Sequence, residues 1–267
     1  MILLLDIGNT HTHVGIGDRD RVLSHVNLPT PAWFQNRIGP LLAKQSHGLV
    51  LEGAVICSVV PRATKAAVRL IAARYGLAAL QLGPETLAGI GIEYPKPETI
   101  GPDRLANAVA VAHHFGAPAV VVDFGTAVTF DVVDAKRNYV GGIIAPGLSA
   151  MTSYLHEKTA LLPAIEIRET TAVIGKNTEE AMLIGAVHGY RGLIRGLLGE
   201  LKQTLKARRL PIVATGGYAE IIAAGMPEIT AVEPLLTLEG LRLTWQAVGS
   251  PAPGARPRRR ARVQTGS

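Results

Sequence analysis

The strongest constraint on the fold is a short pattern that occurs twice in the chain, 117 residues apart. In each copy an apolar run ends in an aspartate, and a glycine turn with small residues follows at once. The two copies are Asp6-Ile7-Gly8-Asn9-Thr10 and Asp123-Phe124-Gly125-Thr126-Ala127. Further strand-like segments and then helices follow both turns. A repeat of this length is too long for a solenoid and predicts a duplicated domain.

The first half of the chain alternates strand-like and helix-like segments. Short apolar runs bounded by turn residues predict strands at 2–6, 13–17, 22–27, 53–60 and 79–82. Helical apolar spacing predicts helices at 32–44, 62–75 and from about 101 to 114, the last with Pro102 in its first turn. Tight turns join the first three strands, which favours an antiparallel meander.

The second half restarts this order after Pro118. Strands are expected at 119–123, 128–133, 139–144 and 212–214, and a short helix after Thr215-Gly216-Gly217. A long helix is expected from 179 to about 207, with Thr178 as its N-cap. The alternation predicts a two-lobed α/β protein with domains at 1–115 and 116–250.

The formal net charge of +6 raises the possibility of a nucleic-acid partner. The excess lies in residues 251–267, which contain five arginines and no acid, whereas residues 1–250 carry 22 basic and 21 acidic side chains. This Pro-, Gly- and Arg-rich tail has no apolar periodicity, so we expect it to be disordered. We expect no nucleic-acid partner for the folded part. A contact between the tail and an acidic partner stays open, beside the alternative of a solvated end with no role.

Cys57 is the only cysteine, which excludes an internal disulfide and an all-cysteine zinc site. Its place in an apolar strand favours a role in the core. The first residues lack the basic segment of a signal peptide, and no apolar run approaches the roughly 18–20 residues that span a bilayer. These observations predict a cytoplasmic protein with no membrane contact.

The two glycine turns have the chemistry of a phosphate site. Glycine permits a close backbone approach, so turn N–H groups and the side chains of Asn9, Thr10 and Thr126 can donate to phosphate oxygens. Asp6 and Asp123 can each hold a hydrated cation that neutralises phosphate charge. Two such turns facing one cleft would hold a triphosphate from both sides, whereas a single one is more often a plain hairpin turn. The chain has neither a Walker-type loop nor a Gly-x-Gly-x-x-Gly loop after a strand.

Gly101-Pro102-Asp103-Arg104 opens the predicted third helix and carries a second group of candidates. In one interpretation Asp103 accepts the proton of a substrate hydroxyl as that oxygen attacks phosphorus, and Arg104 binds an anionic group of the substrate. In the other, Asp103 only interacts with the helix dipole, and Arg104 is its solvated partner. The spacing alone favours the second interpretation.

Two further segments are rich in glycine. Gly141-Gly142-Ile143-Ile144-Ala145-Pro146-Gly147 could pack its backbone against a flat ligand, and the N–H groups of Thr215-Gly216-Gly217 could face a nucleotide at the start of a helix. Each segment is also consistent with an ordinary turn.

Six motifs, taken in order, resemble those of the type III pantothenate kinases. They are Asp6-x-Gly-Asn-Thr10, Tyr94 before Gly101-x-Asp-Arg104, Asp123-Phe-Gly-Thr-Ala-x-Thr129, Gly141-Gly-x-Ile-x-Pro-Gly147, Ile174-Gly-Lys-Asn-Thr178 and Thr215-Gly-Gly217. The resemblance covers about residues 1–245. It implies the fold of acetate and sugar kinases, Hsp70 and actin, in which duplicated actin-like (ribonuclease H-like) domains, each a mixed sheet flanked by helices, enclose a cleft. It also implies ATP-dependent phosphorylation of pantothenate, the first step of coenzyme A biosynthesis.

The same resemblance implies roles for individual residues. Asp103 would be the general base, and Asp123 would hold a monovalent cation, K⁺ or NH₄⁺, used together with Mg²⁺. ATP phosphates would be contacted by Thr126 and by the first turn, namely Asp6, Ile7, Gly8, Asn9, Thr10, His11, Thr12 and His13. Pantothenate would be contacted by Tyr94, Gly101, Pro102, Asp103, Arg104 and Thr178. Family members are homodimers with the substrate site near the subunit interface, so Thr178 would act across it.

Two features depart from the family pattern. Pro102 stands where the family often has alanine, but proline in a first helical turn costs little, so we expect Asp103 to keep its role. The extension after about residue 248 has no counterpart in the family.

Two other functions on the same fold stay open. One is a non-catalytic accessory protein of transcription, because a related branch is associated with activation of virulence genes. Retention of both turns and of Asp103 argues against it. The other is a kinase or phosphatase that acts on a sugar or a polyphosphate, which substrate profiling by ADP release would separate from a pantothenate kinase.

Overall fold

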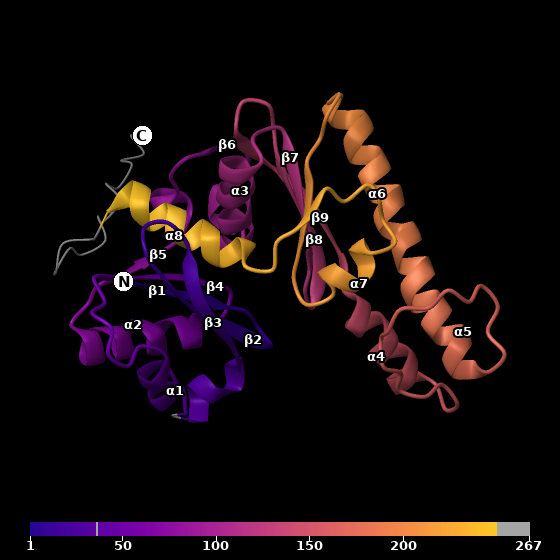
Figure 1. Ribbon diagram of the computed structural model, residues 1–267, viewed down its shortest axis with the longest axis horizontal. Coiled ribbons are helices and arrows are strands. Elements are labelled where there is room, and N and C mark those ends of the chain that lie inside the picture. The colour runs from indigo at the N-terminus through magenta and orange to yellow at the C-terminus, as the bar shows by residue number, and fades with distance from the viewer. Residues whose placement is uncertain (36, 250–267) are drawn as a thin grey trace, which may run out of the picture.

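The computed structural model describes residues 1–35 and 37–249. Two β-sheets lie one after the other along the molecule, and helices cover both faces of each sheet (Figure 1). Every strand predicted from the sequence is present, with ends that differ by no more than a few residues. The predicted α/β class is therefore confirmed.

The first sheet has the strand order β3-β2-β1-β4-β5. β1 (Ile2–Ile7), β2 (His11–Gly17) and β3 (Val22–Pro29) form the predicted antiparallel meander. On its other side β1 pairs in parallel with β4 (Gly53–Ser58), which pairs in parallel with β5 (Ala79–Gln81). β1 is the central strand because its run of aliphatic residues is buried on both faces.

The second sheet has the strand order β11-β10-β7-β8-β9-β6. β7 (Ala119–Phe124), β8 (Ala127–Val133) and β9 (Asn138–Pro146) form a second antiparallel meander. β10 (Ile212–Thr215) and β11 (Ala231–Val232) continue the sheet in parallel beyond β7, and β6 (Gly91–Ile92) pairs in parallel with β9.

The second sheet repeats the first strand by strand. β7 to β11 without β6 reproduce the order and the directions of β1 to β5. The two hairpins differ by one residue, since Asp6 pairs with His13 across β1 and β2, whereas Asp123 pairs with Thr129, one position earlier in the repeat, across β7 and β8. The duplicated architecture predicted from the repeated turn is confirmed.

α1 (Ile38–Gln45) and α2 (Pro61–Tyr75) cover the outer face of the first sheet. The single helix predicted at 32–44 is wrong, because the chain makes a 3₁₀ turn at Thr30–Gln35 and α1 begins only at Ile38. Pro40 explains the break: it lacks an N–H and is tolerated only in the first turn of a helix. α2 ends as expected for a glycine cap, at Gly76 with a φ of 66°.

α3 (Pro102–His114) and α8 (Leu236–Val248) pack against each other between the two sheets. They share a core with Leu4 of the first sheet and Val121 of the second. Gly240 permits the close crossing, because a Cβ at this position would overlap the carbonyl oxygen of Ala106. The sequence-based expectations do not include α8, although its helix places C-terminal residues beneath the candidate site.

The outer face of the second sheet is covered by α6 (Tyr190–Leu205) and α7 (Ala219–Ala223). The predicted long helix consists of α5 (Thr178–Ile184), a π-helical turn at Gly185–Gly189, and α6. The predicted N-cap Thr178 is wrong. Asn177 caps the helix, because its Oδ1 accepts the backbone N–H of Glu180 at 2.9 Å, and Thr178 is the first helical residue.

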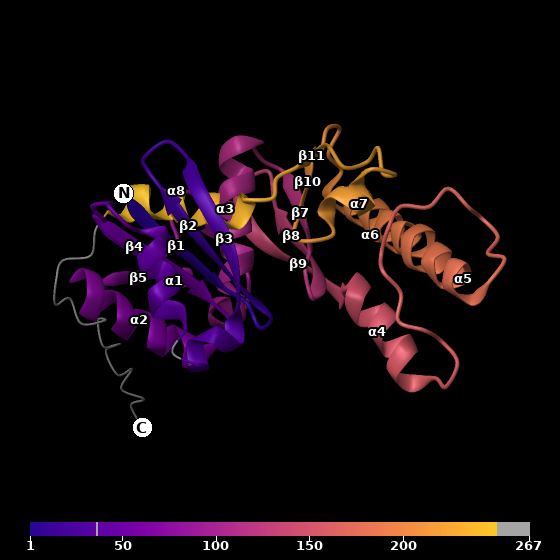
Figure 2. The same ribbon diagram turned by 60° about the horizontal axis from the view of Figure 1, so that its bottom comes forward.

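Two segments cross the proposed domain boundary at residue 115. β6 precedes the boundary but belongs to the second sheet, and α8 follows it but packs on α3 and on the first sheet (Figure 2). The ranges 1–115 and 116–250 therefore remain a proposal about how the chain divides. The predicted tail at 251–267 lies outside the described residues.

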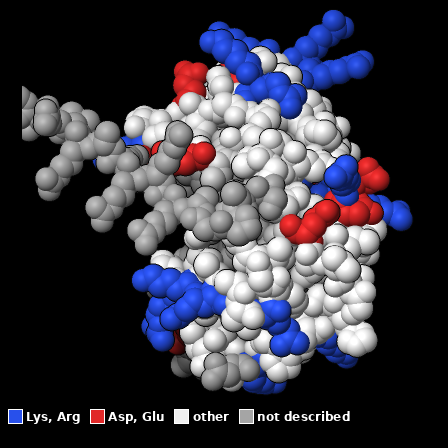
Figure 3. Space-filling model, turned by 90° about the vertical axis from the view of Figure 1, so that its left-hand side faces the viewer, with Lys and Arg blue, Asp and Glu red and all other residues white. Residues whose placement is uncertain are grey.

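The surface features bear on the predicted partners. Within the described part of the chain, no helix is both long and apolar enough to cross a membrane. Figure 3 shows the end of the molecule formed by the first half. The Lys and Arg side chains drawn there form separate groups, several with Asp or Glu beside them, and uncharged surface lies between the groups.

Candidate active site

The two repeated aspartates occupy equivalent places in the two sheets. Asp6 is the fifth residue of β1 and Asp123 the fifth of β7, and both side chains are half-buried. In parallel register, Asp6 lies beside Cys57 of β4, and Asp123 lies beside Thr215 of β10. Ligands of open α/β sheets commonly bind at this carboxyl edge. The fold therefore presents one carboxylate at the same edge of each sheet.

The turns that follow these aspartates meet each other. Thr10 Oγ1 lies 3.2 Å from Thr126 Oγ1, and both side chains are exposed. Two hydrogen bonds stabilise the first turn. The Gly8 N–H donates to the carbonyl of His11 at 2.9 Å, and the Thr30 hydroxyl donates to the carbonyl of Gly8 at 2.7 Å. Two candidate phosphate turns, one from each half, thus face a common space.

Asp6, Asp103 and Asp123 lie close enough to act on one another's ionisation. Burial, reinforced by the charge of Asp103, raises the pKa of Asp6 to about 7, although the Cys57 thiol donates to Asp6 Oδ1 at 3.2 Å. Burial, reinforced by Asp6 and Asp103, likewise raises the pKa of Asp123 to about 7, and the Asn107 amide opposes this rise. A negative charge on one of these carboxylates disfavours ionisation of its neighbours, so a bound cation would stabilise the ionised group.

Asp103 is held at the start of α3. Its Oδ1 accepts the backbone N–H of Arg104 at 2.9 Å, and Pro102 occupies the first helical position, where no helical N–H bond is lost. Gly101 leaves room for the carboxylate, because a Cβ there would lie 2.5 Å from Asp103 Oδ1. Burial raises the pKa of Asp103, and the N–H and charge of Arg104 oppose this. A fixed carboxylate with a raised pKa is suited to accept a proton.

Arg104 is fixed by neighbours from β8. Its Nε donates to Asp131 Oδ1 at 2.5 Å, and its Nη2 donates to the carbonyl of Phe130 at 2.8 Å. Burial acts to lower the pKa of Arg104, but the charge and hydrogen bond of Asp131, together with Tyr139 and Asp103, outweigh burial and raise it. Gly142 makes room for this arrangement, because a Cβ there would overlap the carbonyl oxygen of Phe130. The guanidinium is thus charged and held in one orientation.

Tyr139 lies beside this arginine, and Tyr94 lies beside Tyr139. The guanidinium carbon of Arg104 lies 5.8 Å from the ring centre of Tyr139, and the Tyr94 ring centre lies 6.2 Å from that of Tyr139. Gly141, with a φ of 123°, lies against Tyr94, since a Cβ there would be 3.5 Å from that ring. The Gly141 segment, a separate motif in the sequence, therefore joins Tyr94 and Arg104 in one group.

The acidic group fits a cation that is bound together with phosphate. In the described part of the chain, no three His, Cys, Asp or Glu side chains lie close enough to hold a metal ion by themselves. Mg²⁺ commonly uses one or two carboxylates together with phosphate oxygens and waters. Of the three site aspartates, only Asp103 has an arginine charge that lowers its pKa. The residues thus suit a cation site that phosphate oxygens complete.

Not every candidate side chain of the first turn faces this space. Ile7 is buried in the core of the first half, and the Thr12 hydroxyl is occupied by Thr30 and by Trp33 Nε1. His13 Nδ1 lies 2.6 Å from Asn27 Oδ1, and burial lowers the pKa of His13. The exposed side chains of this turn are those of Asn9, Thr10 and His11.

Thr178 is not brought to the other candidates within one chain. It begins α5, which lies at the opposite end of the molecule from α1 and α2 and far from the start of α3 in both views (Figures 1 and 2). Its side chain is exposed.

Four residues of this region are not among the candidates from the sequence: Cys57, Asn107, Asp131 and Thr237. Asn107 lies one helical turn after Asp103, and this i, i+4 spacing could have indicated a shared face. Asp131 is the only charged residue of the mostly apolar strand β8, which is a second usable signal, and the structure buries it fully. Nothing in the sequence near Thr237 indicates its role.

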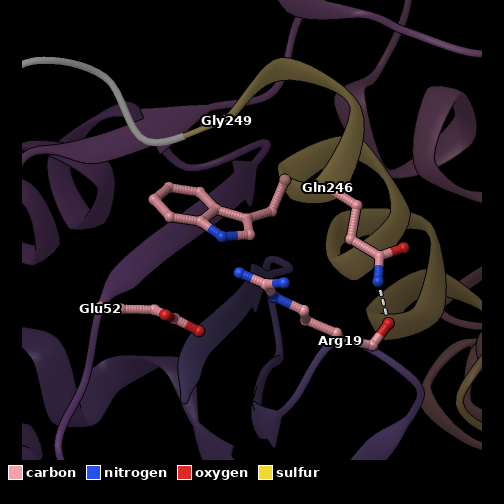
Figure 4. A pocket seen from close by; sticks show the side chains of 5 residues that line it. Arg19, Glu52, Gln246 and Gly249 are labelled. Atoms are coloured by element: carbon pink, nitrogen blue, oxygen red, sulfur yellow. Dashed lines mark hydrogen bonds between the residues drawn. The ribbon is translucent and has the colours of Figure 1, made fainter.

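A separate pocket lies on the other side of the first half. Its volume is about 470 Å³, and it is lined by Arg19, Glu52, Trp245, Gln246 and Gly249 (Figure 4). The amide of Gln246 donates to the carbonyl of Arg19 at its rim. None of the candidate site residues lines this pocket, so it is distinct from the carboxylate group.

Comparison with known proteins yields a family match and close relatives. The model of the type III pantothenate kinase family matches residues 2–200. A type III pantothenate kinase of Akkermansia muciniphila is 45% identical over 242 residues, covering 90% of this chain and 96% of the relative. One of Methylacidiphilum infernorum is 42% identical over 247 residues, covering 91% of this chain and 87% of the relative.

Solved structures share the fold at low sequence identity. A Campylobacter jejuni protein named for the Baf family of transcriptional activators has a TM-score of 0.57 at 17% identity, covering 91% of this chain and 97% of that one. The ethanolamine utilization protein EutJ of Carboxydothermus hydrogenoformans has a TM-score of 0.53 at 17% identity, covering 91% and 89%. At such identities the likeness concerns the fold alone.

Proposed function

The chain belongs to the type III pantothenate kinase family, and we propose that it transfers the γ-phosphoryl group of ATP to the primary hydroxyl of pantothenate, with Asp103 as the general base. The product is 4′-phosphopantothenate, and the reaction is the first step of coenzyme A biosynthesis. The observation that carries the proposal is the meeting of three carboxylates and two turns from both halves, joined by the contact between Thr10 and Thr126.

The chemical step needs a proton acceptor beside the attacking oxygen. The pantothenate hydroxyl oxygen forms a bond to Pγ, the bond from Pγ to the bridging oxygen of ADP breaks, and the hydroxyl proton passes to the carboxylate of Asp103. Two observations support this role: Asp103 is fixed by the N–H of Arg104, and burial raises its pKa toward the range in which a carboxylate accepts protons well.

The opposite end of pantothenate carries a carboxylate, and Arg104 is the cation that we assign to it. Nε and one N–H of Nη2 are occupied by Asp131 and Phe130, so three of the five guanidinium N–H groups remain for a ligand. We assign Tyr94, Gly101 and Pro102 to the walls around the substrate. The contact between the Tyr94 and Tyr139 rings supports the placing of Tyr94.

We assign the ATP phosphates to the two turns and the cations to the aspartates. The exposed Asn9, Thr10, His11 and Thr126 supply side chains, and Gly8, Ile7, Thr12, His13 and Asp6 complete the first turn. We assign a monovalent cation, K⁺ or NH₄⁺, to Asp123 and Mg²⁺ to the phosphates. When bound, these cations would neutralise phosphate charge, and the raised pKa of Asp6 and Asp123 supports such a site.

We further propose that the protein is a homodimer in which Thr178 acts on the substrate of the partner subunit. Met151, Tyr154 and Leu155 lie at i, i+3, i+4 spacing on α4 (Leu148–Lys158), and Tyr154 is 62% exposed. In the loop after α4, Leu161 is 89% exposed. Such an apolar surface is typical of a contact between subunits.

Sedimentation velocity tests the dimer. The wild type should sediment as a dimer, Tyr154→Lys should shift it toward monomer, and Leu23→Lys, an exposed apolar residue on β3, should leave it dimeric. A wild type that stays monomeric at the concentration used in the activity assay would overturn this part of the proposal.

Product analysis tests the function itself. The wild type with ATP, Mg²⁺ and K⁺ should release one ADP per pantothenate consumed, and mass spectrometry should find 4′-phosphopantothenate. Sugars and polyphosphate, offered in parallel, should give no comparable ADP release. A preference for one of those acceptors would replace pantothenate as the substrate and leave the kinase assignment in place.

A further inference from the structure

A buried amide lies near the proposed substrate arginine and is joined to it through Asp131. Asn107 lies on α3, one turn after Asp103, and is 1% exposed. Its Nδ2 lies 3.4 Å from Oδ2 of Asp131 and 3.5 Å from Oδ2 of Asp123. The two hydrogens of one amide group therefore span two carboxylates of the second sheet, one on β8 and one on β7.

The orientation of this amide is set from another helix. Asn107 turns its NH₂ group toward the carboxylate oxygens of Asp123 and Asp131, which accept hydrogen bonds from it. The Thr237 hydroxyl on α8 donates to Asn107 Oδ1 at 2.8 Å. Because this bond occupies the amide oxygen, it favours the orientation in which the NH₂ group faces both carboxylates.

The same contacts continue to Arg104. Asp131 accepts from Asn107 through Oδ2 and from Arg104 Nε through Oδ1, so its carboxylate is held at both oxygens. Asp131 is fully buried, and loss of either partner would leave a buried carboxylate oxygen without that hydrogen-bond donor. The orientation of the guanidinium thus depends on Asp131, and that of Asp131 depends on Asn107.

We propose that Asn107 and Thr237 are positioning residues, which act through Asp131 to aim the free N–H groups of Arg104 at the substrate carboxylate. This rests on the proposed binding of pantothenate by Arg104. It gives α8 a part in substrate recognition through Thr237, which lies 130 positions after Asn107 in the chain. Gly240, one turn further along α8, sets the distance between α8 and α3 that this bond requires.

The kinetic consequence follows from where Arg104 acts. The carboxylate of pantothenate takes no part in the chemical step. Arg104 should therefore bind it equally strongly in the ground state and in the transition state. Weakening such a contact raises KM and leaves kcat largely unchanged. A hydrogen bond of ordinary net strength corresponds to roughly a three- to tenfold change in binding.

The test uses three variants of the full-length chain. Thr237→Val removes the hydroxyl and keeps the shape, and Thr237→Ser keeps the hydroxyl. Thr244→Val is the matched control, because it makes the same change on the same helix and Thr244 donates only to Gly240 of its own helix, at 2.8 Å. Thr237→Val should raise the pantothenate Kd, measured by calorimetry, and the pantothenate KM by roughly three- to tenfold, with kcat within about twofold. Thr237→Ser and Thr244→Val should stay close to wild type.

A readout without substrate separates this inference from the proposed function. In wild type the Nε–H of Arg104 should give a sharp ¹⁵N–¹H signal that exchanges slowly, because a buried carboxylate holds it. Thr237→Val should broaden this signal or speed its exchange, and Thr244→Val should not. Equal signals and equal Kd in both valine variants would overturn the positioning role. If the wild type neither binds nor phosphorylates pantothenate, but Thr237→Val still changes the Arg104 signal, the proposed function alone is overturned.

Discussion

The hydroxyl oxygens of Thr10 and Thr126 lie 3.2 Å apart, although the two residues are 116 positions apart in the chain. Each follows the glycine of one copy of the repeated turn, so the contact marks the line along which the two halves meet. Both hydroxyls are exposed, and a hydroxyl can exchange such a partner for a phosphate oxygen. This pair is therefore where ATP binding and the approach of the two halves can be tested together.

Thr126→Val should weaken ATP binding without unfolding the protein. Removal of one donor to phosphate should raise the ATP KM by roughly two- to tenfold, while the pantothenate KM stays near wild type. Because the residue is exposed, the free energy of unfolding should change by no more than about 0.5 kcal/mol. Initial rates over an ATP series and a thermal melt check both parts, and Thr204→Val on the surface of α6 is the control. An unchanged ATP KM would remove Thr126 from the phosphate site.

The raised pKa of Asp123 predicts a loss of stability as the pH rises. In the folded, cation-free protein this pKa is about 7, against an ordinary value of 3.8. Between these values the folded state keeps a proton that the unfolded chain releases, so the free energy of unfolding falls as pH rises toward 7 and levels off above it. Asp6 behaves in the same way.

Thermal melts of wild type and Asp123→Asn in the absence of Mg²⁺ and nucleotide check this. Asn cannot ionise, so the variant should gain stability relative to wild type at about pH 7.5 and show little or no gain at about pH 4. A difference between the two proteins that does not change over this range would contradict the raised pKa.

The Cys57 thiol should be inert in the folded protein. It is fully buried, and burial, together with the charges of Asp6 and Asp103, raises its pKa well above the ordinary value, so almost no thiolate forms. A thiol reagent at mildly alkaline pH should label less than one tenth of the chains in minutes, and should label every chain once denaturant is added. Cys57→Ser keeps a donor to Asp6 and should retain more activity than Cys57→Ala. Rapid labelling of the native protein would contradict the burial of this thiol.

The crossing of α3 and α8 predicts opposite effects of the same substitution at two glycines. Gly240→Ala would force a Cβ into the Ala106 carbonyl and should destabilise the protein by about 1–3 kcal/mol. Gly196→Ala, on an open part of α6, meets nothing within 4 Å and should stabilise it by about 0.5–1 kcal/mol. Denaturant unfolding of both variants measures the difference. Equal effects would mean that the two helices do not cross closely at Gly240.

Local sequence signals were sufficient for the longer strands and for the duplication, but not for the two-residue strands β6 and β11. The strands were predicted because apolar runs end at turn residues in both halves, and Asp6 and Asp123 mark equivalent strand positions. Helix ends were less well predicted. Asn177 and Thr178 are both good caps, and only the hydrogen bond to Glu180 decides between them. Pro40 was the signal against a continuous helix at 32–44, because proline is tolerated only in the first turn of a helix and α1 begins two residues before it.

The site was only partly predictable, because its buried polar contacts join elements far apart in the chain. The carboxylates and turns could be found from motifs that each half carries on its own. Thr237 could not, since its role depends on α8 returning to pack beside α3, 130 residues after Asn107. No local sequence pattern predicts a contact between residues so far apart in the chain.

The single-turnover rate of phosphoryl transfer in wild type and Asp103→Asn tests the central claim most directly. Asn has the size of Asp but cannot take a proton from the pantothenate hydroxyl. With enzyme in excess over ATP, and with Mg²⁺, K⁺ and saturating pantothenate, the variant should react roughly 10²–10⁴-fold more slowly. Its pantothenate Kd should stay within about threefold of wild type, and Asp20→Asn on the exposed β2–β3 turn should react at the wild-type rate. A transfer rate in Asp103→Asn equal to that of wild type would contradict the account.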